Sequence, residues 1–141
     1  MPFDLTIVTP EGEAFHDTVE TVILPGTEGD FGVLPGHEPF LTALRIGAAE
    51  LATGSETYHA ALSGGWAEVH GDEVTVMSPS CEFAHEIDLE RAEVARERAH
   101  RMLEEMRATA QGEDVYEEYQ EAYSRALTRL NVSKKQEQFK H

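Results

Sequence analysis

The chain has 141 residues, of which 40% are apolar, and it carries a formal net charge of −16. This length suits one ordinary domain, or a smaller domain with an appendage. No stretch approaches the roughly 18 uninterrupted apolar residues of a membrane-spanning helix. No basic region precedes an apolar run near Met1, so we expect no signal peptide and a location in the cytoplasm.

The negative charge is concentrated in the first part of the chain. Residues 1–90 hold seventeen acidic residues and one basic residue, Arg45, whereas residues 91–141 hold ten of each. Such an acidic surface repels nucleic-acid phosphates, which argues against DNA or RNA as a partner. It suits either a basic protein surface or a salt-rich cytoplasm, and both explanations stay open. The lone cysteine, Cys81, fits a reducing compartment, as a small buried apolar residue.

The first 86 residues are predicted to form strands. Apolar and polar residues alternate over Phe3–Val8, and a second strand over Thr18–Leu24 ends at Pro25-Gly26. Four glycines and two prolines over Pro25–Gly36 predict consecutive tight turns, because glycine tolerates positive φ and proline fixes φ.

Further strands are predicted over Tyr58–Leu62 and in a hairpin of Trp66–Val69 with Val74–Met77, which turns at Gly71. Turn residues recur about every 8–12 residues, as in all-β domains. We therefore expect an all-β sandwich or barrel over residues 1–86.

The pattern changes to helical spacing after Asp88. Apolar residues recur at steps of three and four from Leu89 to Ala110, and again from Val115 to Leu130. The break at Gln111-Gly112 predicts an antiparallel two-helix hairpin over residues 87–133. Its many alanines allow close packing but bury little apolar area, so we expect the hairpin to be held weakly. Residues 134–141 are expected to form a flexible tail.

Four arginines fall in pairs on these helices. Arg91 and Arg98 are seven residues apart, and Arg125 and Arg129 are four apart, so each pair shares a helical face. In a folded hairpin the pairs could converge on one cleft. Acidic side chains such as Glu121 would neutralise them there, or guanidinium groups would bind the phosphates of a nucleotide. Asp88 is the predicted N-cap of the first helix.

Three segments together resemble a known family. The Pro-Gly-rich stretch Val22–Pro39 resembles the hallmark segment of the epsilon subunits of bacterial F-type ATP synthases. Ser63–Val69 with Val74–Val76 resembles the family's later strand pair. Ile87–Ala92 matches the Ile/Leu-Asp-x-x-Arg-Ala motif of members whose C-terminal part binds ATP. The resemblance covers nearly the whole chain in order.

This resemblance implies a non-catalytic subunit of the synthase's central stalk. Such a subunit couples proton-driven rotor-ring rotation to ATP synthesis and restrains ATP hydrolysis through a mobile helical hairpin. Its implied partners are the gamma subunit, the catalytic beta subunits with alpha, and the c subunits of the membrane rotor ring. Its implied location is the cytoplasmic face of the bacterial inner membrane, as a peripheral protein without a transmembrane segment.

The resemblance also implies two sets of site residues. The loop at Asp30, Phe31 and His37 would lie near the rotor ring or gamma, with Phe31 as an exposed aromatic contact. A regulatory ATP site would take the motif positions and the arginines, with no required cofactor and no metal; its residues are Glu82, Ile87, Asp88, Arg91, Ala92, Arg98, Arg125 and Arg129. The candidates for contact with acidic beta surfaces are Arg101, Arg107, Lys134 and Lys135.

Two other classes of function fit the sequence less well. The sequence has no Gly-x-x-x-x-Gly-Lys-Ser/Thr loop and no Gly-x-Ser-x-Gly elbow, which argues against a nucleotide hydrolase or a serine hydrolase. A β-barrel metalloenzyme would have to use scattered residues at unfavourable spacing, namely His37, Glu38, His59 and His70. The remaining alternative is an acidic β-sandwich adaptor with a helical arm, unrelated to the synthase.

Overall fold

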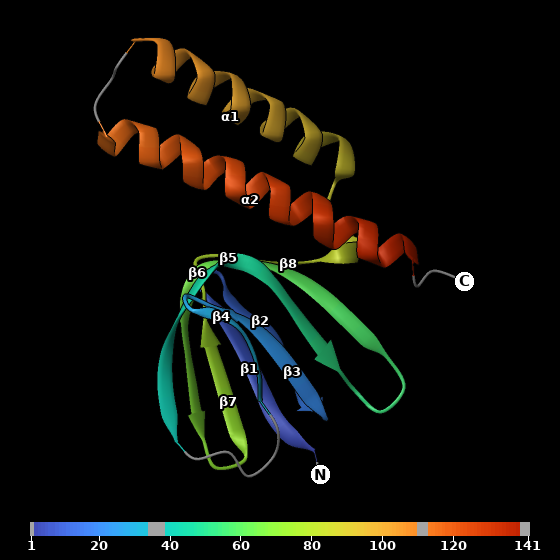
Figure 1. Ribbon diagram of the computed structural model, residues 1–141. Helices are drawn as coiled ribbons and strands as arrows, with labels where there is room; N and C mark the ends of the chain where they lie inside the picture. Colours follow the sequence, from blue (N-terminus) through green and yellow to red (C-terminus); the bar gives the residue numbers. More distant parts are fainter. Residues whose placement is uncertain (1, 34–38, 110–112, 139–141) are drawn as a thin grey trace.

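The computed structural model describes residues 2–33, 39–109 and 113–138. The described part is a β-sandwich followed by two helices that run antiparallel, which confirms the predicted fold class (Figure 1). In chain order the elements are β1 (Phe3–Thr9), β2 (Gly12–Val19), β3 (Thr21–Gly26), β4 (Gly29–Val33), β5 (Phe40–Ala52), β6 (Thr57–His70), β7 (Glu73–Met77), β8 (Cys81–Phe83), the 3₁₀ turn η1 (Ala84–Glu86), α1 (Leu89–Thr109) and α2 (Glu113–Gln138).

The described strands form one mixed sheet in the order β2-β1-β7-β6-β5-β3-β4, and β8 also pairs with β6. Neighbouring strands are antiparallel except β1 and β7, which are parallel with Leu5 beside Val74. The two long strands β5 and β6 pair along their whole length. One end of β6 pairs with β7 and the other end with β8, so β6 joins both layers of the sandwich.

The path of β6 depends on two consecutive glycines. Gly64 and Gly65 have φ values of 90° and 116°, a backbone region that other residues rarely adopt. A Cβ atom on Gly65 would lie 1.9 Å from the carbonyl oxygen of Met77 in β7. The prediction of separate strands over Tyr58–Leu62 and Trp66–Val69 is therefore wrong, because the glycines carry one strand through the bend.

The Pro-Gly-rich segment is also more regular than expected. The prediction of consecutive turns over Pro25–Gly36 is wrong for its described part. β3 continues to Gly26 and pairs with β4 through Gly29, so the turn between them contains only Thr27 and Glu28. Glycine is compatible with a strand where the backbone approaches a neighbour closely.

The strand predicted over Thr18–Leu24 is divided into two. β2 ends at Val19 and β3 begins at Thr21. Between them the Glu20 N–H donates to the carbonyl oxygen of Ala52, at 2.7 Å. This bond directs the chain from one layer into the other.

The described apolar side chains form two separate clusters. The main core lies inside the sandwich and takes its buried residues only from Phe3 to Phe83. A small second cluster joins Val132 of α2 to Ala61 of β6 and Ala84 of η1, with Ala48 and Ile87 partly buried beside it. The hairpin therefore packs on the outside of the sandwich, with α2 next to the strands and α1 farther away (Figure 1).

The seam between the helices follows the predicted apolar stripe. Its buried side chains are Ala92, Ala99, Leu103, Met106, Ala126 and Leu130. α2 continues to Gln138, so the segment 134–138, which we expected as a tail, is helical. Few residues in this segment oppose helix formation, and neither glycine nor proline interrupts it.

Candidate functional site

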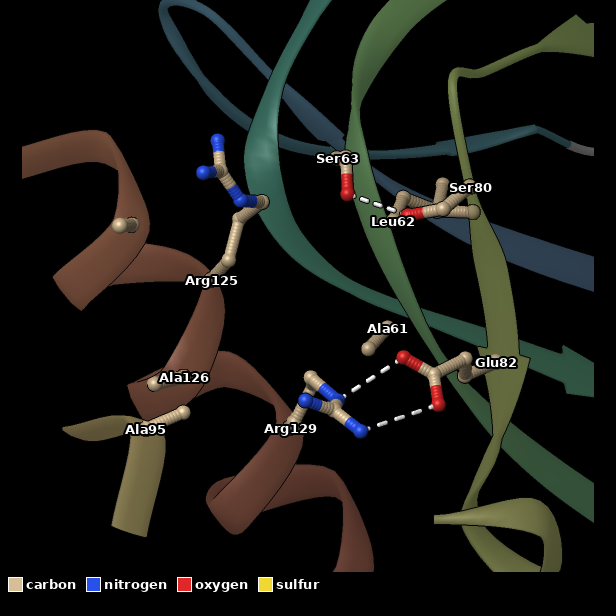
Figure 2. Close-up of a pocket in the computed structure, with 10 residues that line it drawn as sticks. Ala61, Leu62, Ser63, Ser80, Glu82, Ala95, Arg125, Ala126 and Arg129 are labelled. Carbon is tan, nitrogen blue, oxygen red and sulfur yellow. Dashed lines mark hydrogen bonds and ion pairs between the residues drawn. The ribbon is translucent and has the colours of Figure 1, made fainter. Parts of the chain in front are cut away.

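A cavity of about 350 Å³ lies where α2 crosses β6 and β8 (Figure 2). One face comes from α2, the opposite face comes from the sheet, and α1 contributes one alanine. The lining residues are Ala61, Leu62, Ser63, Ser80, Glu82, Ala95, Ala122, Arg125, Ala126 and Arg129. Small side chains on both faces keep the space open, and the two arginines and Glu82 supply its charge.

Arg129 and Glu82 form a two-point ion pair across this cavity. The Nε atom of Arg129 lies 2.8 Å from Oε1 of Glu82, and Nη2 lies 3.3 Å from Oε2. Both side chains are partly shielded from solvent, with exposed fractions of 23% and 36%. A guanidinium fork on a carboxylate is a strong, directional pair, and it ties α2 to β8.

Arg125 is held more loosely than Arg129. Its nearest described acidic partner is Glu121 on the same helix, with 3.9 Å between Nη1 and Oε2. Figure 2 shows Arg125 and Arg129 reaching toward the sheet from α2, with only Arg129 joined to Glu82. The guanidinium of Arg125 is thus the more available of the two for an anion.

The first-helix residues of the predicted site lie apart from this cavity. The N-cap prediction for Asp88 is confirmed, since its Oδ1 atom accepts the Arg91 N–H at 3.1 Å. Arg91 and Arg98 are exposed and do not line the cavity. Ala92 is buried in the helix seam, and Ile87 packs against the Val132 cluster.

The four arginines therefore do not converge on one cleft in this structure. Arg125 and Arg129 meet at the cavity, whereas Arg91 and Arg98 flank Ala95, the α1 residue that lines it. They stand four residues before and three residues after Ala95, and so share its helical face. The side chains of Arg91 and Arg98 are exposed to solvent, and only Ala95 of α1 lines the cavity.

The second predicted site lies near the β3–β4 turn. Asp30 pairs with Arg45, at 2.5 Å between Oδ1 and Nη2, and Nη1 of Arg45 donates to the carbonyl oxygen of Gly26. Phe31 is half-buried against the main core and contacts Phe40 edge-on. The expectation that Phe31 is an exposed aromatic is therefore wrong, because the β3–β4 hairpin turns its ring inward. His37 lies outside the described residues.

An apolar surface that sequence reasoning missed lies beside this turn. Leu41 is 61% exposed, Trp66 is 52% exposed and Met77 is 43% exposed. Trp66 pairs with Met77 across neighbouring strands, and Leu41 and Trp66 line one shallow pocket with Asp30 and Phe31. Such exposed apolar side chains are typical of protein contacts. The signal that could have found this surface is strand alternation. Because Ala67 and Val69 are buried, Trp66 must lie on the opposite, outer face of its strand.

The described residues contain no group of three or more side chains suited to hold a metal ion. Burial chiefly raises the pKa of the Cys81 thiol to about 12, with Glu86 and Glu82 adding to the shift. The thiol is therefore protonated near neutral pH and poorly nucleophilic. Within the described helices, none is long and apolar enough to span a membrane.

Comparison with known proteins accounts for both parts of the fold. The model of the ATP synthase delta/epsilon chain beta-sandwich domain matches residues 2–84, and that of the delta/epsilon chain long alpha-helix domain matches residues 85–134. The chain belongs to the ATP synthase delta/epsilon chain family. This confirms the resemblance that the sequence motifs indicated, and it argues against an unrelated adaptor.

Curated relatives agree with this family assignment over almost their whole length. The ATP synthase epsilon chain of Syntrophobacter fumaroxidans is 44% identical over 131 residues, covering 93% of this chain and 95% of the relative. That of Bacillus mycoides is 39% identical over 131 residues, covering 93% and 96%. The prediction of a non-catalytic subunit of the synthase rather than an enzyme in its own right is thus confirmed.

A solved structure shows the same fold. A chain in the cryo-EM structure of the Euglena gracilis mitochondrial ATP synthase, OSCP/F1/c-ring, superposes with a TM-score of 0.78 at 24% identity. The match covers 94% of this chain and 81% of that chain. The two chains therefore share this fold at low sequence identity.

Proposed function

We propose that this chain couples rotation of the proton-driven rotor ring to ATP synthesis and limits ATP hydrolysis through a mobile hairpin. The observation that carries the proposal is the separation of the two apolar clusters. No buried residue of the main core comes from the described helices, so α1 and α2 can leave the sandwich without opening it. Hydrolysis would be blocked when the released hairpin extends toward the catalytic subunits.

The contact that holds the docked hairpin is small. Val132 is the one large side chain among the buried members of the second cluster, the others being Ala61 and Ala84, and Ile87 is partly buried against it. Apolar burial contributes about 25 cal/mol per Å², so alanine contacts stabilise the docked state only modestly. The Arg129–Glu82 pair adds a second, polar attachment. Two states close in free energy are what a regulatory arm requires.

ATP is the ligand that we propose for the cavity between α2 and the sheet. The cavity offers Arg125 and Arg129 against one carboxylate, Glu82, and this excess of positive charge suits phosphate oxygens. Arg91 and Arg98 share a helical face with Ala95, which lines the cavity, and we propose that they turn toward the phosphates when ATP binds. ATP bound to both helices and to β8 would favour the docked state.

The sandwich would supply the fixed attachment to the rotor. We propose the exposed surface of Leu41, Trp66 and Met77 as its contact with the gamma subunit. The β3–β4 hairpin at Asp30 and Phe31, with His37, would be the side facing the c subunits. The acidic sandwich would repel any partner with the same charge, so these contacts depend on apolar and basic partner surfaces. The assembled protein would lie at the cytoplasmic face of the membrane, near alpha and beta.

The inhibitory role is tested by removing the hairpin. A synthase assembled with a chain truncated after Ile87 should hydrolyse ATP faster than the intact complex, because the blocking arm is absent. ATP synthesis driven by a proton gradient should continue, since the sandwich keeps its rotor contacts. Unchanged hydrolysis in a fully assembled complex would exclude the inhibitory role.

The ATP site is tested by calorimetric titration of the isolated chain. Arg125→Ala should weaken ATP binding at least about tenfold, as expected for loss of a charge-assisted hydrogen bond of 1.5–3 kcal/mol. Arg91→Ala should weaken ATP binding less than Arg125→Ala, because Arg91 does not line the cavity. Arg101→Ala, on the exposed surface of α1, is the matched control and should bind like the parent chain. Equal affinity in all four proteins would rule out this site.

ATP binding would shift the hairpin by mass action. At a free ATP concentration one hundred times the dissociation constant, the docked state gains about 2.7 kcal/mol. This amount is comparable with the contribution expected from one buried valine and one half-exposed ion pair. Nucleotide supply would therefore be sufficient to change the dominant state of the arm.

A further inference from the structure

His59 of β6 is buried beneath the docked hairpin rather than inside the sandwich. Its neighbour Ala60 belongs to the main core, and side chains alternate between the two faces of a strand. His59 and Ala61 therefore share the outer face, where Ala61 packs against Val132 of α2. His59 is only 5% exposed, because α2 lies over this part of β6 (Figure 1).

Charged groups approach this imidazole from both sides of the contact. Glu50 lies opposite on β5, with 3.8 Å between its Oε1 atom and Nε2 of His59, beyond ordinary hydrogen-bond distance. Lys135 of α2 lines the same cavity of about 220 Å³. Asp30 of β4 and Arg45 of β5 also line it but are paired with each other. On β8, Glu82 is paired with Arg129.

These surroundings oppose a positive charge on His59 while the hairpin is docked. Burial is the main cause that lowers the pKa of His59, and Lys135 lowers it further, whereas Glu50 acts in the opposite direction. The docked state therefore holds the imidazole neutral over a wider pH range than water would.

We propose that His59 makes hairpin docking sensitive to pH, so that acidification of the surrounding solution releases α1 and α2 from the sandwich. The inference rests on the mobile hairpin of the proposed function and adds a second signal to it. When α2 leaves, Lys135 leaves with it and the outer face of β6 meets water. Protonated His59 then regains hydration and keeps Glu50 as a neighbour.

Proton linkage determines the direction in which pH changes hairpin docking. The pKa of His59 is lower in the docked state than in the undocked state, so the docked state binds fewer protons. Docking is strongest above the undocked pKa, near the ordinary value of about 6.5, and weakens as the pH falls through it. Between the two pKa values, the ratio of docked to undocked chains falls by up to about tenfold per pH unit.

The experiment measures the undocked fraction directly in the intact chain. With Cys81 replaced by serine, spin labels at Thr57→Cys and Asn131→Cys report the distance between β6 and α2 by pulsed electron paramagnetic resonance. Both positions are exposed. From pH 7.5 to 5.5 the long-distance fraction should rise severalfold in the parent chain and stay constant in His59→Gln. His70→Gln, exposed on the same strand, should keep the full pH response.

A second measurement covers the case in which His59→Gln folds poorly. By proton NMR of the parent chain, His59 should titrate below the ordinary histidine pKa of about 6.5. Lys135→Gln should narrow that difference, because it removes the positive charge brought by α2. Titration of His59 at or above the ordinary histidine pKa, or equal pH responses of the parent and His59→Gln, would overturn the inference.

A release variant separates this inference from the mobile hairpin itself. Val132→Arg places a charge that does not titrate in this range into the small second cluster. If this variant gives long spin-label distances while the distances in the parent chain do not change with pH, the hairpin is mobile and only the role of His59 is wrong. If even this variant gives no long distances, the mobile hairpin of the proposed function is wrong.

Discussion

At Gly65 the backbone of β6 comes so close to β7 that one added carbon atom would not fit. The Cβ position lies 1.9 Å from the carbonyl oxygen of Met77, far inside van der Waals contact. This is backbone against backbone, so no flexible side chain can move aside to relieve it. The resemblance had pointed to Ser63–Val69 as a family segment, and the close approach supplies a physical reason for glycine there.

Gly65→Ala should therefore destabilise the chain more than an alanine at another positive-φ glycine. Gly12 is the matched control, since its φ is 120° and nothing lies within 4 Å of its Cβ position. Gly12→Ala should cost about 1–2 kcal/mol from backbone strain alone. Gly65→Ala should cost at least about 2 kcal/mol more, because β6 and β7 must separate. Urea unfolding monitored by the single tryptophan, Trp66, measures both; equal losses would contradict the steric explanation.

Single residues of the candidate site were predictable only where their role is local. The cap at Asp88 depends on its own helix and could be predicted from a short polar side chain before an apolar stripe. The Arg129–Glu82 pair joins residues 47 positions apart, and spacing alone does not encode such a contact. Arg91 and Arg98 were correctly placed on one helical face, but spacing did not indicate that this face would stay open to solvent.

At the scale of elements, α2 is the part of the hairpin that contacts the sandwich. Val132 is fully buried in the small second cluster, whereas Val94 on α1 is 55% exposed. The same substitution by arginine would therefore place a charge in a buried position at Val132 and in an exposed position at Val94. Only the substitution at Val132 should disturb the contact between α2 and the sandwich.

Val132→Arg should undock the hairpin and leave the sandwich folded. An uncompensated buried charge costs about 3–5 kcal/mol, more than the small second cluster is expected to supply. Amide hydrogen exchange should then accelerate across α2 while the central strands keep their protection. Val94→Arg should leave both unchanged. Faster exchange throughout β5 and β6 would instead mean that the hairpin supports the main core.

The helices were easier to predict than the strands for a physical reason. A helix carries its signal in its own periodicity, so α1 and much of α2 could be located within a residue or two. β5 holds four alanines and three leucines among its 13 residues, and these favour helix. Its pairing with β3 and β6 makes it a strand. β4 holds two glycines and an aspartate in five residues, which is typical of a turn.

At the scale of the whole molecule, the sandwich should be stable without its helices. Every buried member of the main core precedes Ala84, so truncation after Ile87 removes none of them. We expect the truncated chain to unfold cooperatively, with a midpoint within a few degrees of the intact chain by circular dichroism. A loss of cooperativity would show that the helices complete the core, and the hydrolysis experiment would then need a different truncation.

The parallel pairing of β1 with β7 has a consequence for synthesis on the ribosome. The first strand has no partner on that edge until residues near Val74 have left the exit tunnel, and at about 5–20 residues per second that wait lasts several seconds. During this time the apolar side of Phe3–Thr9 is covered only by its hairpin partner β2. The nascent chain therefore depends on early β1–β2 pairing, and on chaperones, to keep the apolar side of β1 from aggregating before β7 pairs with it.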